Sequence, residues 1–172
     1  NAFAAPGGII GINLGMFLNT EREGELASVM CHELAHLSQR HFARSQNRNS
    51  PLANALMILG SIAVAAASRN PEAILIAPAA MQQMSINYTR SNEKEADRIG
   101  FNNLVKAGFD PNDMTMMFQR MQDKYQNEDS EQFSYLMTHP LPSERLTDMR
   151  IRADGLKNNS KNSFRDNIDF YL

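Results

Sequence analysis

The stretch from Cys31 to Leu37 contains the residue types of a hydrolytic metal site, because two histidines lie four residues apart and Glu33 directly follows the first. On a helix, such positions lie about 40° apart around the axis and about 6 Å along it, so His32 and His36 can bind one metal ion. Glu33 lies about 100° from His32, where it can reach a water molecule bound to the metal but cannot easily be a ligand. Neutral imidazole suits zinc, and hydrolysis needs a general base beside that water. The H-E-x-x-H pattern therefore predicts a zinc hydrolase with Glu33 as the base.

A helix must carry these residues, and the sequence around them favours one. Thr20 and Glu23 have the spacing of a capping box, which predicts that the helix begins near residue 21. The polar segment 44–51 ends in a proline and predicts that the helix ends before it. One side of this helix is expected to face the core and the opposite side the metal; the predicted core side consists of Leu26, Met30, Leu34 and Leu37.

Two histidines need a third protein ligand, and a carboxylate from a later helix commonly supplies it. Residues 85–108 predict such a helix, with Gly108 just past its end. Glu93 and Asp97 share one face of that helix, whereas Glu95 points elsewhere. Any single carboxylate on a charged helix is also expected on a solvated face, and this alternative fits Glu95 best.

The composition of the whole chain sets its class. With 172 residues, 42% of them hydrophobic and 21% charged, the chain is long enough for one globular domain. A net charge of -2 with mixed signs predicts no nucleic-acid partner. The only cysteine, Cys31, excludes an internal disulfide and is expected to be a buried apolar thiol pointing away from the metal. No signal peptide is present in the chain, and we expect it to be an N-terminally truncated piece of a longer protein.

The remaining segments predict the elements that surround the site. Glycine-interrupted apolar residues at 2–18 predict one or two short strands or a hairpin, whose edge could bind an extended peptide. The apolar segment 52–84 predicts a helical hairpin or lid packed over the active site, with membrane contact as the alternative. Asp110-Pro111 begins the next helix, and Ser143 is the expected N-cap of a last helix that runs to Gly155. A buried stripe is expected at Met114, Met117, Phe118 and Met121.

The motifs together resemble those of a known family. His32-Glu33-Leu34-Ala35-His36, Glu93-x-x-x-Asp97 and the N-terminal Asn1-Ala2-Phe3-Ala4 with Gly7-Gly8 resemble the gluzincin metallopeptidases of the HtpX and CAAX prenyl protease family. Within it the chain is most similar to the periplasmic BepA-like proteases, over roughly residues 1 to 155. The resemblance implies an α+β, mostly helical fold with a zincin-like metalloprotease core and a small edge sheet. It places the metallopeptidase domain at 1–155 and a tail or linker towards missing C-terminal sequence at 156–172.

The resemblance also implies roles for individual residues. Glu93 becomes the third ligand of one zinc ion, and Asp97 the carboxylate that orients a zinc histidine. His139-Pro140-x-x-x-x-Arg145 resembles a family segment in which the histidine and the arginine face the zinc cleft. Either residue could stabilise the oxyanion, with Tyr88 as a weaker candidate. Alternatively, His139 could occupy the position of the water and inhibit the enzyme.

The function implied by the resemblance is zinc-dependent endopeptidase activity on misfolded or misassembled envelope proteins in the periplasm. Its partners are then unfolded or misassembled protein substrates and the outer-membrane assembly machinery. One alternative is a protein-binding, chaperone-like module with a self-inhibited zinc site. A membrane-embedded prenyl-protein protease is the other, but it needs apolar spans of about twenty residues, which the run from Leu52 to Ala67 does not reach.

Overall fold

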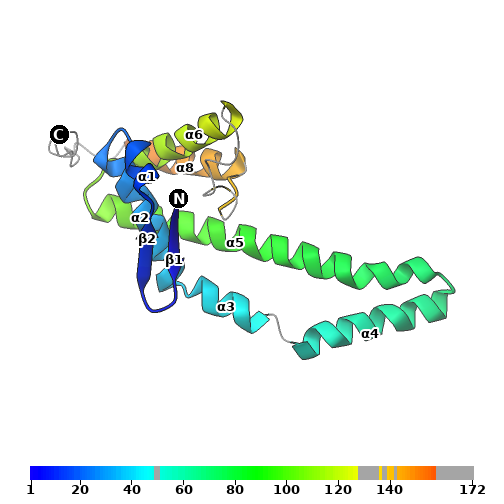
Figure 1. Cartoon of the computed structure of the whole chain (residues 1–172). Helices are drawn as coiled ribbons and strands as arrows, with labels where there is room; N and C mark the ends of the chain where they lie inside the picture. Colours follow the sequence, from blue (N-terminus) through cyan, green and yellow to red (C-terminus); the bar gives the residue numbers. More distant parts are fainter. Residues whose placement is uncertain (49–50, 128–135, 137–138, 142, 158–172) are drawn as a thin grey trace. The chain divides into compact units, whose positions relative to one another are not determined.

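A computed structural model describes residues 1–48, 51–127, 136, 139–141 and 143–157 (Figure 1). The fold is α+β and mostly helical with one small antiparallel sheet among the described residues, which confirms the predicted class. The chain length predicts one domain, whereas the structure divides the chain into two compact units. The first unit joins Asn1–Gln39 to the described residues from Glu93 onward, and the second is Arg40–Asn92.

The first unit begins with the predicted hairpin. Strand β1 (Ala2–Ala5) pairs with β2 (Ile9–Ile12), with Ala2 opposite Ile12. The turn requires positive φ at Gly7 and Gly8, a conformation that glycine adopts without steric cost. The chain then forms helix α1 (Leu14–Leu18), so the strand prediction for residues 14–18 was wrong. The side chain of Asn13 caps this helix by accepting a hydrogen bond from Gly15 N at 3.0 Å.

Helix α2 (Glu23–Ser38) carries the H-E-x-x-H motif and begins two residues later than predicted. The N-cap is Arg22 and not Thr20, which the predicted capping box would require, and the Thr20 hydroxyl donates to Phe17 O at 3.1 Å. Instead, the carboxylate of Glu25 accepts a hydrogen bond from the backbone of Glu21 at 2.7 Å. The helix ends before Arg40, whose φ of 54° breaks the helical path.

The predicted core side of α2 was wrong for two of its four residues. Met30 is 44% exposed and Leu34 is 47% exposed, whereas Leu26 is buried. The buried residues of α2 include Glu25, Ser28, His32 and Glu33. Hydrophobicity alone misassigns the helix because its polar side faces the interior, where those groups find partners.

The core of the first unit lies among α2, helix α6 (Pro111–Asn127), helix α8 (Ser143–Lys157) and the C-terminal part of helix α5 (Ile76–Lys106). The predicted stripe on α6 is confirmed, since Met114, Met117, Phe118 and Met121 are all buried. Gly108 adopts φ 88° just past α5, and Phe109 N donates to Leu104 O at 3.2 Å, as in a Schellman cap. Helix α8 starts at Ser143 and continues past Gly155, so the last predicted helix is two residues too short.

The described residues of the second unit are helical except for Arg40, Arg69 and Asn70. Helix α3 (His41–Arg48) covers most of the polar segment 44–51. The prediction that the metal-site helix ends before this segment is confirmed, because α2 ends at Ser38. Helix α4 (Pro51–Ser68), a 3-10 helix η1 (Pro71–Leu75) and the start of α5 form the predicted helical hairpin. Pro78 does not interrupt α5, because it lies in the first turn, where its missing N–H is not needed.

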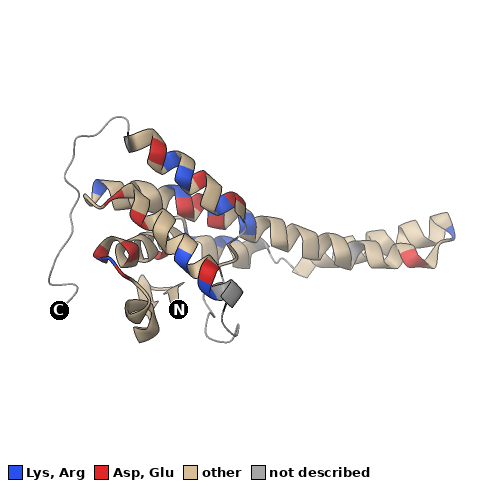
Figure 2. Cartoon of the chain, turned by 90° about the horizontal axis from the view of Figure 1, so that it is seen from above, with Lys and Arg blue, Asp and Glu red and all other residues tan. Residues whose placement is uncertain are grey.

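The hairpin of the second unit is unusual in composition. Between residues 51 and 89 only Arg69 and Glu72 are charged, and Figure 2 shows these helices almost wholly without charged residues. Six large apolar side chains of α4 are exposed: Leu52, Leu56, Ile58, Leu59, Ile62 and Val64. No helix among the described residues is both long and apolar enough to cross a membrane.

Candidate metal centre

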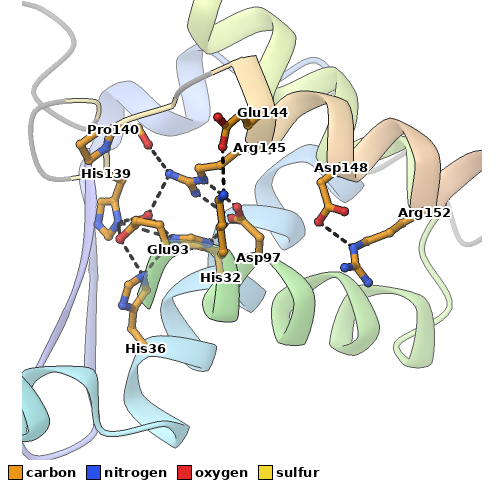
Figure 3. A network of polar contacts seen from close by, with 11 residues as sticks. His32, His36, Glu93, Asp97, His139, Pro140, Glu144, Arg145, Asp148 and Arg152 are labelled. Atoms are coloured by element: carbon orange, nitrogen blue, oxygen red, sulfur yellow. Dashed lines mark hydrogen bonds and ion pairs between the residues drawn. The ribbon is translucent and has the colours of Figure 1, made fainter. Parts of the chain in front are cut away.

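Three elements of the first unit supply the candidate site (Figure 3). Helix α2 presents two histidines and Glu33, α5 presents two carboxylates one turn apart, and the segment at α8 presents a histidine and an arginine. These are the residues to which the sequence assigned chemistry: His32, Glu33, His36, Glu93, Asp97, His139 and Arg145. Glu95 lies outside the cluster, and Tyr88 belongs to the second unit.

Four side chains meet closely enough to hold a metal ion: His32, His36, Glu93 and His139. The Nε2 atoms of the two α2 histidines lie 3.0 Å apart, and each lies 3.3 Å from a carboxylate oxygen of Glu93. His139 Nδ1 lies 3.4 Å from His32 Nε2 and 3.2 Å from both Glu93 oxygens. Ligands on a tetrahedral zinc with bonds of about 2.0 to 2.1 Å are separated by about 3.3 Å. The donor atoms therefore fit zinc in both type and spacing.

His139 contacts the other three donors as well as Glu33. While its Nδ1 faces the other donors, its Nε2 lies 3.4 Å from Glu33 Oε1. Both Glu33 and His139 are buried. The imidazole therefore takes up the space between the general-base candidate and the metal-ligand candidates, where the attacking water of a metallohydrolase must lie.

Asp97 contacts the back of the first histidine. Its Oδ1 lies 3.0 Å from His32 Nδ1, on the ring edge opposite the donor cluster. A carboxylate at this nitrogen fixes the tautomer and the ring orientation, leaving Nε2 free to bind a metal. A carboxylate in this position can perform the orienting role that the family resemblance implies for Asp97.

The neighbouring charges in the site shift three pKa values, and each shift favours the charged form of the group. Burial lowers the pKa of His32, but hydrogen bonds and charges from Asp97 and Glu93 outweigh it and raise that pKa to about 9. Burial alone would raise the pKa of both carboxylates, yet their hydrogen bonds to histidines hold the pKa of Glu93 and of Asp97 well below the usual range. The surrounding charges thus favour the anionic form of both carboxylates and the cationic form of His32. A metal cation can replace the additional proton on His32.

Arg145 is 3% exposed and contacts oxygens with all three guanidinium nitrogens. Nε and Nη2 donate to the two oxygens of Asp97 at 2.6 and 2.7 Å. Nη1 donates to the Pro140 carbonyl at 2.5 Å and lies 2.9 Å from Glu93 Oε2. Figure 3 shows the guanidinium between these three groups.

Gly100 is a site residue that the sequence reasoning missed. A Cβ at this position would lie 3.0 Å from the N and Cα of His32, closer than ordinary packing allows. The backbones of α5 and α2 therefore meet here, and this contact sets how near Glu93 comes to the histidines. The available signal was spacing, since Glu93, Asp97 and Gly100 recur at i, i+4 and i+7 on one helix face.

Cys31 follows its prediction in part. It is half-buried and packs against the apolar cluster formed by α5, α6 and α8. Burial raises the pKa of its thiol to about 11, which makes it a poor metal ligand or nucleophile at neutral pH.

Comparison of the sequence with known proteins shows the family of the chain. The sequence model of Peptidase family M48 matches residues 1–153. The chain belongs to peptidase family M48. A Vibrio cholerae protein is 50% identical over 89% of this chain and 32% of its own length. The beta-barrel assembly-enhancing protease of Escherichia coli K12 is 40% identical over 100% of this chain and 35% of its own length.

A more distant M48 relative is the mitochondrial metalloendopeptidase OMA1 of Schizosaccharomyces pombe. It is 30% identical over 85% of this chain and 41% of its own length. The chain spans about a third of the length of the bacterial relatives it matches. Membership of the M48 family and the cluster of histidines and Glu93 together imply a metal at this site.

Proposed function

We propose that the chain is the catalytic part of a zinc-dependent endopeptidase that hydrolyses misfolded or misassembled envelope proteins in the bacterial periplasm. The observation that supports this most strongly is the four-donor cluster with the carboxylate of Glu33 directly beside it. Likeness to the beta-barrel assembly-enhancing protease of Escherichia coli supports envelope substrates and contact with the outer-membrane assembly machinery.

In this proposal, His32, His36 and Glu93 hold one zinc ion, and Asp97 orients His32. When bound, zinc supplies Lewis acidity for the scissile carbonyl and lowers the pKa of water. Glu33 accepts a proton from the attacking water and later passes it to the leaving amine. This role is supported by the position of its buried carboxylate, whose Oε1 lies 3.4 Å from His139 Nε2 beside the cluster.

His139 in this proposal acts as a self-inhibiting group in the resting state. Its Nδ1 is as close to the other donors as they are to one another, and its Nε2 faces the carboxylate of Glu33. The imidazole must leave this position before water and a peptide can enter. A self-inhibited zinc site is compatible with a protease, so it gives no reason to prefer the chaperone-like alternative.

Membrane contact through residues 52–84 is a further part of the proposal. It is supported by the exposed apolar side chains of α4 and by the absence of charge along that helix. Apolar surface of this kind is typical of membrane or protein contact sites.

The test combines metal content with proteolysis. The wild-type chain loaded with zinc is expected to cleave an unfolded protein such as reduced casein. Glu33→Gln should keep its zinc and its fold but lose cleavage by several orders of magnitude, because an amide cannot accept the proton. Equal cleavage by the two proteins, or a wild type that binds no zinc, would contradict the proposal.

A further inference from the structure

The buried guanidinium of Arg145 joins two parts of the site. On one side it binds Asp97 and Glu93, two carboxylates of the long helix α5. On the other it binds the carbonyl of Pro140, the residue that directly follows His139. We propose that Arg145 is a positioning residue that couples the position of the His139 segment to the zinc affinity of the site. This inference rests on the proposed zinc site, whose regulation it describes.

The geometry needs an arginine. Two parallel N–H groups match the two oxygens of Asp97, at 2.6 and 2.7 Å, and leave the third nitrogen to face Glu93 and the Pro140 carbonyl. A lysine ammonium is a compact charge without this planar fork. Arg145→Lys therefore keeps the charge but loses the simultaneous contacts.

Towards the metal ligands, the link runs through shared oxygen atoms. Asp97 Oδ1 contacts both Arg145 Nη2 at 2.7 Å and His32 Nδ1 at 3.0 Å. A shift of the guanidinium therefore moves the oxygen that orients the imidazole. Glu93 Oε2 is likewise shared, since it lies 2.9 Å from Arg145 Nη1 and 3.3 Å from His32 Nε2.

Towards the inhibiting segment, the link is a hydrogen bond to the backbone. The bond from Nη1 to the Pro140 carbonyl holds the chain next to His139. If the backbone at Pro140 moves as His139 leaves the donor cluster, this bond lengthens or breaks, and Nη1 loses one of its oxygen contacts while it still faces Glu93. Movement of the His139 segment and retention of zinc therefore both depend on the contacts of Arg145 Nη1.

The first test measures zinc affinity by competition with a chromogenic chelator. Arg145→Lys is expected to bind zinc about tenfold to a hundredfold more weakly, the usual range for residues that support metal ligands. The matched control is Arg152→Lys, which alters an arginine of the same helix whose Nε lies 2.8 Å from Asp148 at the surface. Its zinc affinity should equal that of the wild type. Equal affinity for Arg145→Lys and the wild type would overturn the inference.

The second test measures coupling, which a merely structural role would not produce. The rate of zinc release into excess chelator is compared with and without His139→Ala, in the wild type and in Arg145→Lys. We expect His139→Ala to change the rate several-fold in the wild type and by a factor near one in the Arg145→Lys background. Equal factors in both backgrounds would show independent residues and overturn the coupling.

A third variant covers the case in which Arg145→Lys does not fold, as judged by thermal unfolding of the metal-free protein. Pro140→Gly keeps Arg145 and both carboxylates but loosens the backbone that the guanidinium holds. It should also reduce the effect of His139→Ala on zinc release, and an unchanged effect would contradict the inference. None of these measurements needs proteolysis. A wild type that binds zinc without cleaving would contradict the proposed function alone, and one that binds no zinc would contradict both.

Discussion

The candidate site in the first unit and helix α4 in the second place charge and apolar surface in opposite ways. The site buries the ionisable side chains of His32, Glu93, Asp97 and Arg145, and each has oppositely charged or hydrogen-bonding neighbours within 3.3 Å. Helix α4 has no charged residue and exposes large apolar side chains, with Leu52 reaching 70%. Buried charge persists only when it is paired, so the polar residues of the site depend on one another. The exposed apolar side chains of α4 need no such partners, and we expect that replacing them leaves the metal site intact.

The largest effect should come from removing a donor. His32→Ala, His36→Ala and Glu93→Ala should each weaken zinc binding by more than the roughly hundredfold cost of changing a supporting residue. Glu95→Ala, two residues from Glu93 and outside the cluster, is the matched control and should bind zinc normally. Metal analysis after dialysis measures this. If Glu95→Ala loses its zinc while Glu93→Ala keeps it, the assignment of Glu93 as the ligand is wrong.

A second prediction concerns the sign of the His139 effect. If the imidazole blocks the water position, His139→Ala should raise the cleavage rate of an unfolded protein. If it stabilises the oxyanion, the rate should fall by roughly a hundredfold. We expect the rise, because its Nδ1 lies within 3.4 Å of His32 Nε2 while its Nε2 faces Glu33. Rates compared at equal zinc occupancy decide between the two, and a fall with unchanged zinc would exclude the blocking role.

A third prediction applies the same substitution to both regions. Gly100→Ala should destabilise the chain by about 1 to 3 kcal/mol and weaken zinc binding, because the new Cβ presses against the backbone of His32. Gly60→Ala in α4 meets no atom within 4 Å and should stabilise the chain by about 0.5 to 1 kcal/mol. Chemical denaturation with zinc titration measures both. Equal effects at the two glycines would show that α2 and α5 can separate at no cost.

The smallest effect on the site is expected from the apolar face of α4. Leu56→Glu and Leu59→Glu replace exposed side chains and should change the free energy of unfolding by less than about 0.5 kcal/mol. Zinc affinity should not change. Sedimentation with vesicles of phosphatidylethanolamine and phosphatidylglycerol should show weaker binding if this face contacts a membrane. Matched substitution of Ser68 by Glu, at the exposed end of α4, serves as the control for added charge.

The sequence predicted those features whose signals are local. The spacing of His32 and His36, the positive φ of Gly108 and the methionine stripe of α6 all follow from helix geometry or backbone sterics. The exposed side of α2 was misassigned because the partners of its polar residues come from elements distant in sequence. The spacing of Glu93, Asp97 and Gly100 places the glycine on the site face of α5, but it does not show that the distant helix α2 approaches it there.

The division of the chain also bears on the order in which the molecule folds. The first unit is interrupted in sequence, because the whole second unit lies between Gln39 and Glu93. During synthesis, His32 and His36 therefore emerge well before the carboxylate of Glu93, and His139 emerges later still. The second unit contains only neighbouring elements and can form early, whereas the first unit must await contacts distant in sequence. We therefore expect the complete donor set, and with it tight zinc binding, late in folding. It forms after Arg145 has emerged from the ribosome and has bound Asp97 and Glu93.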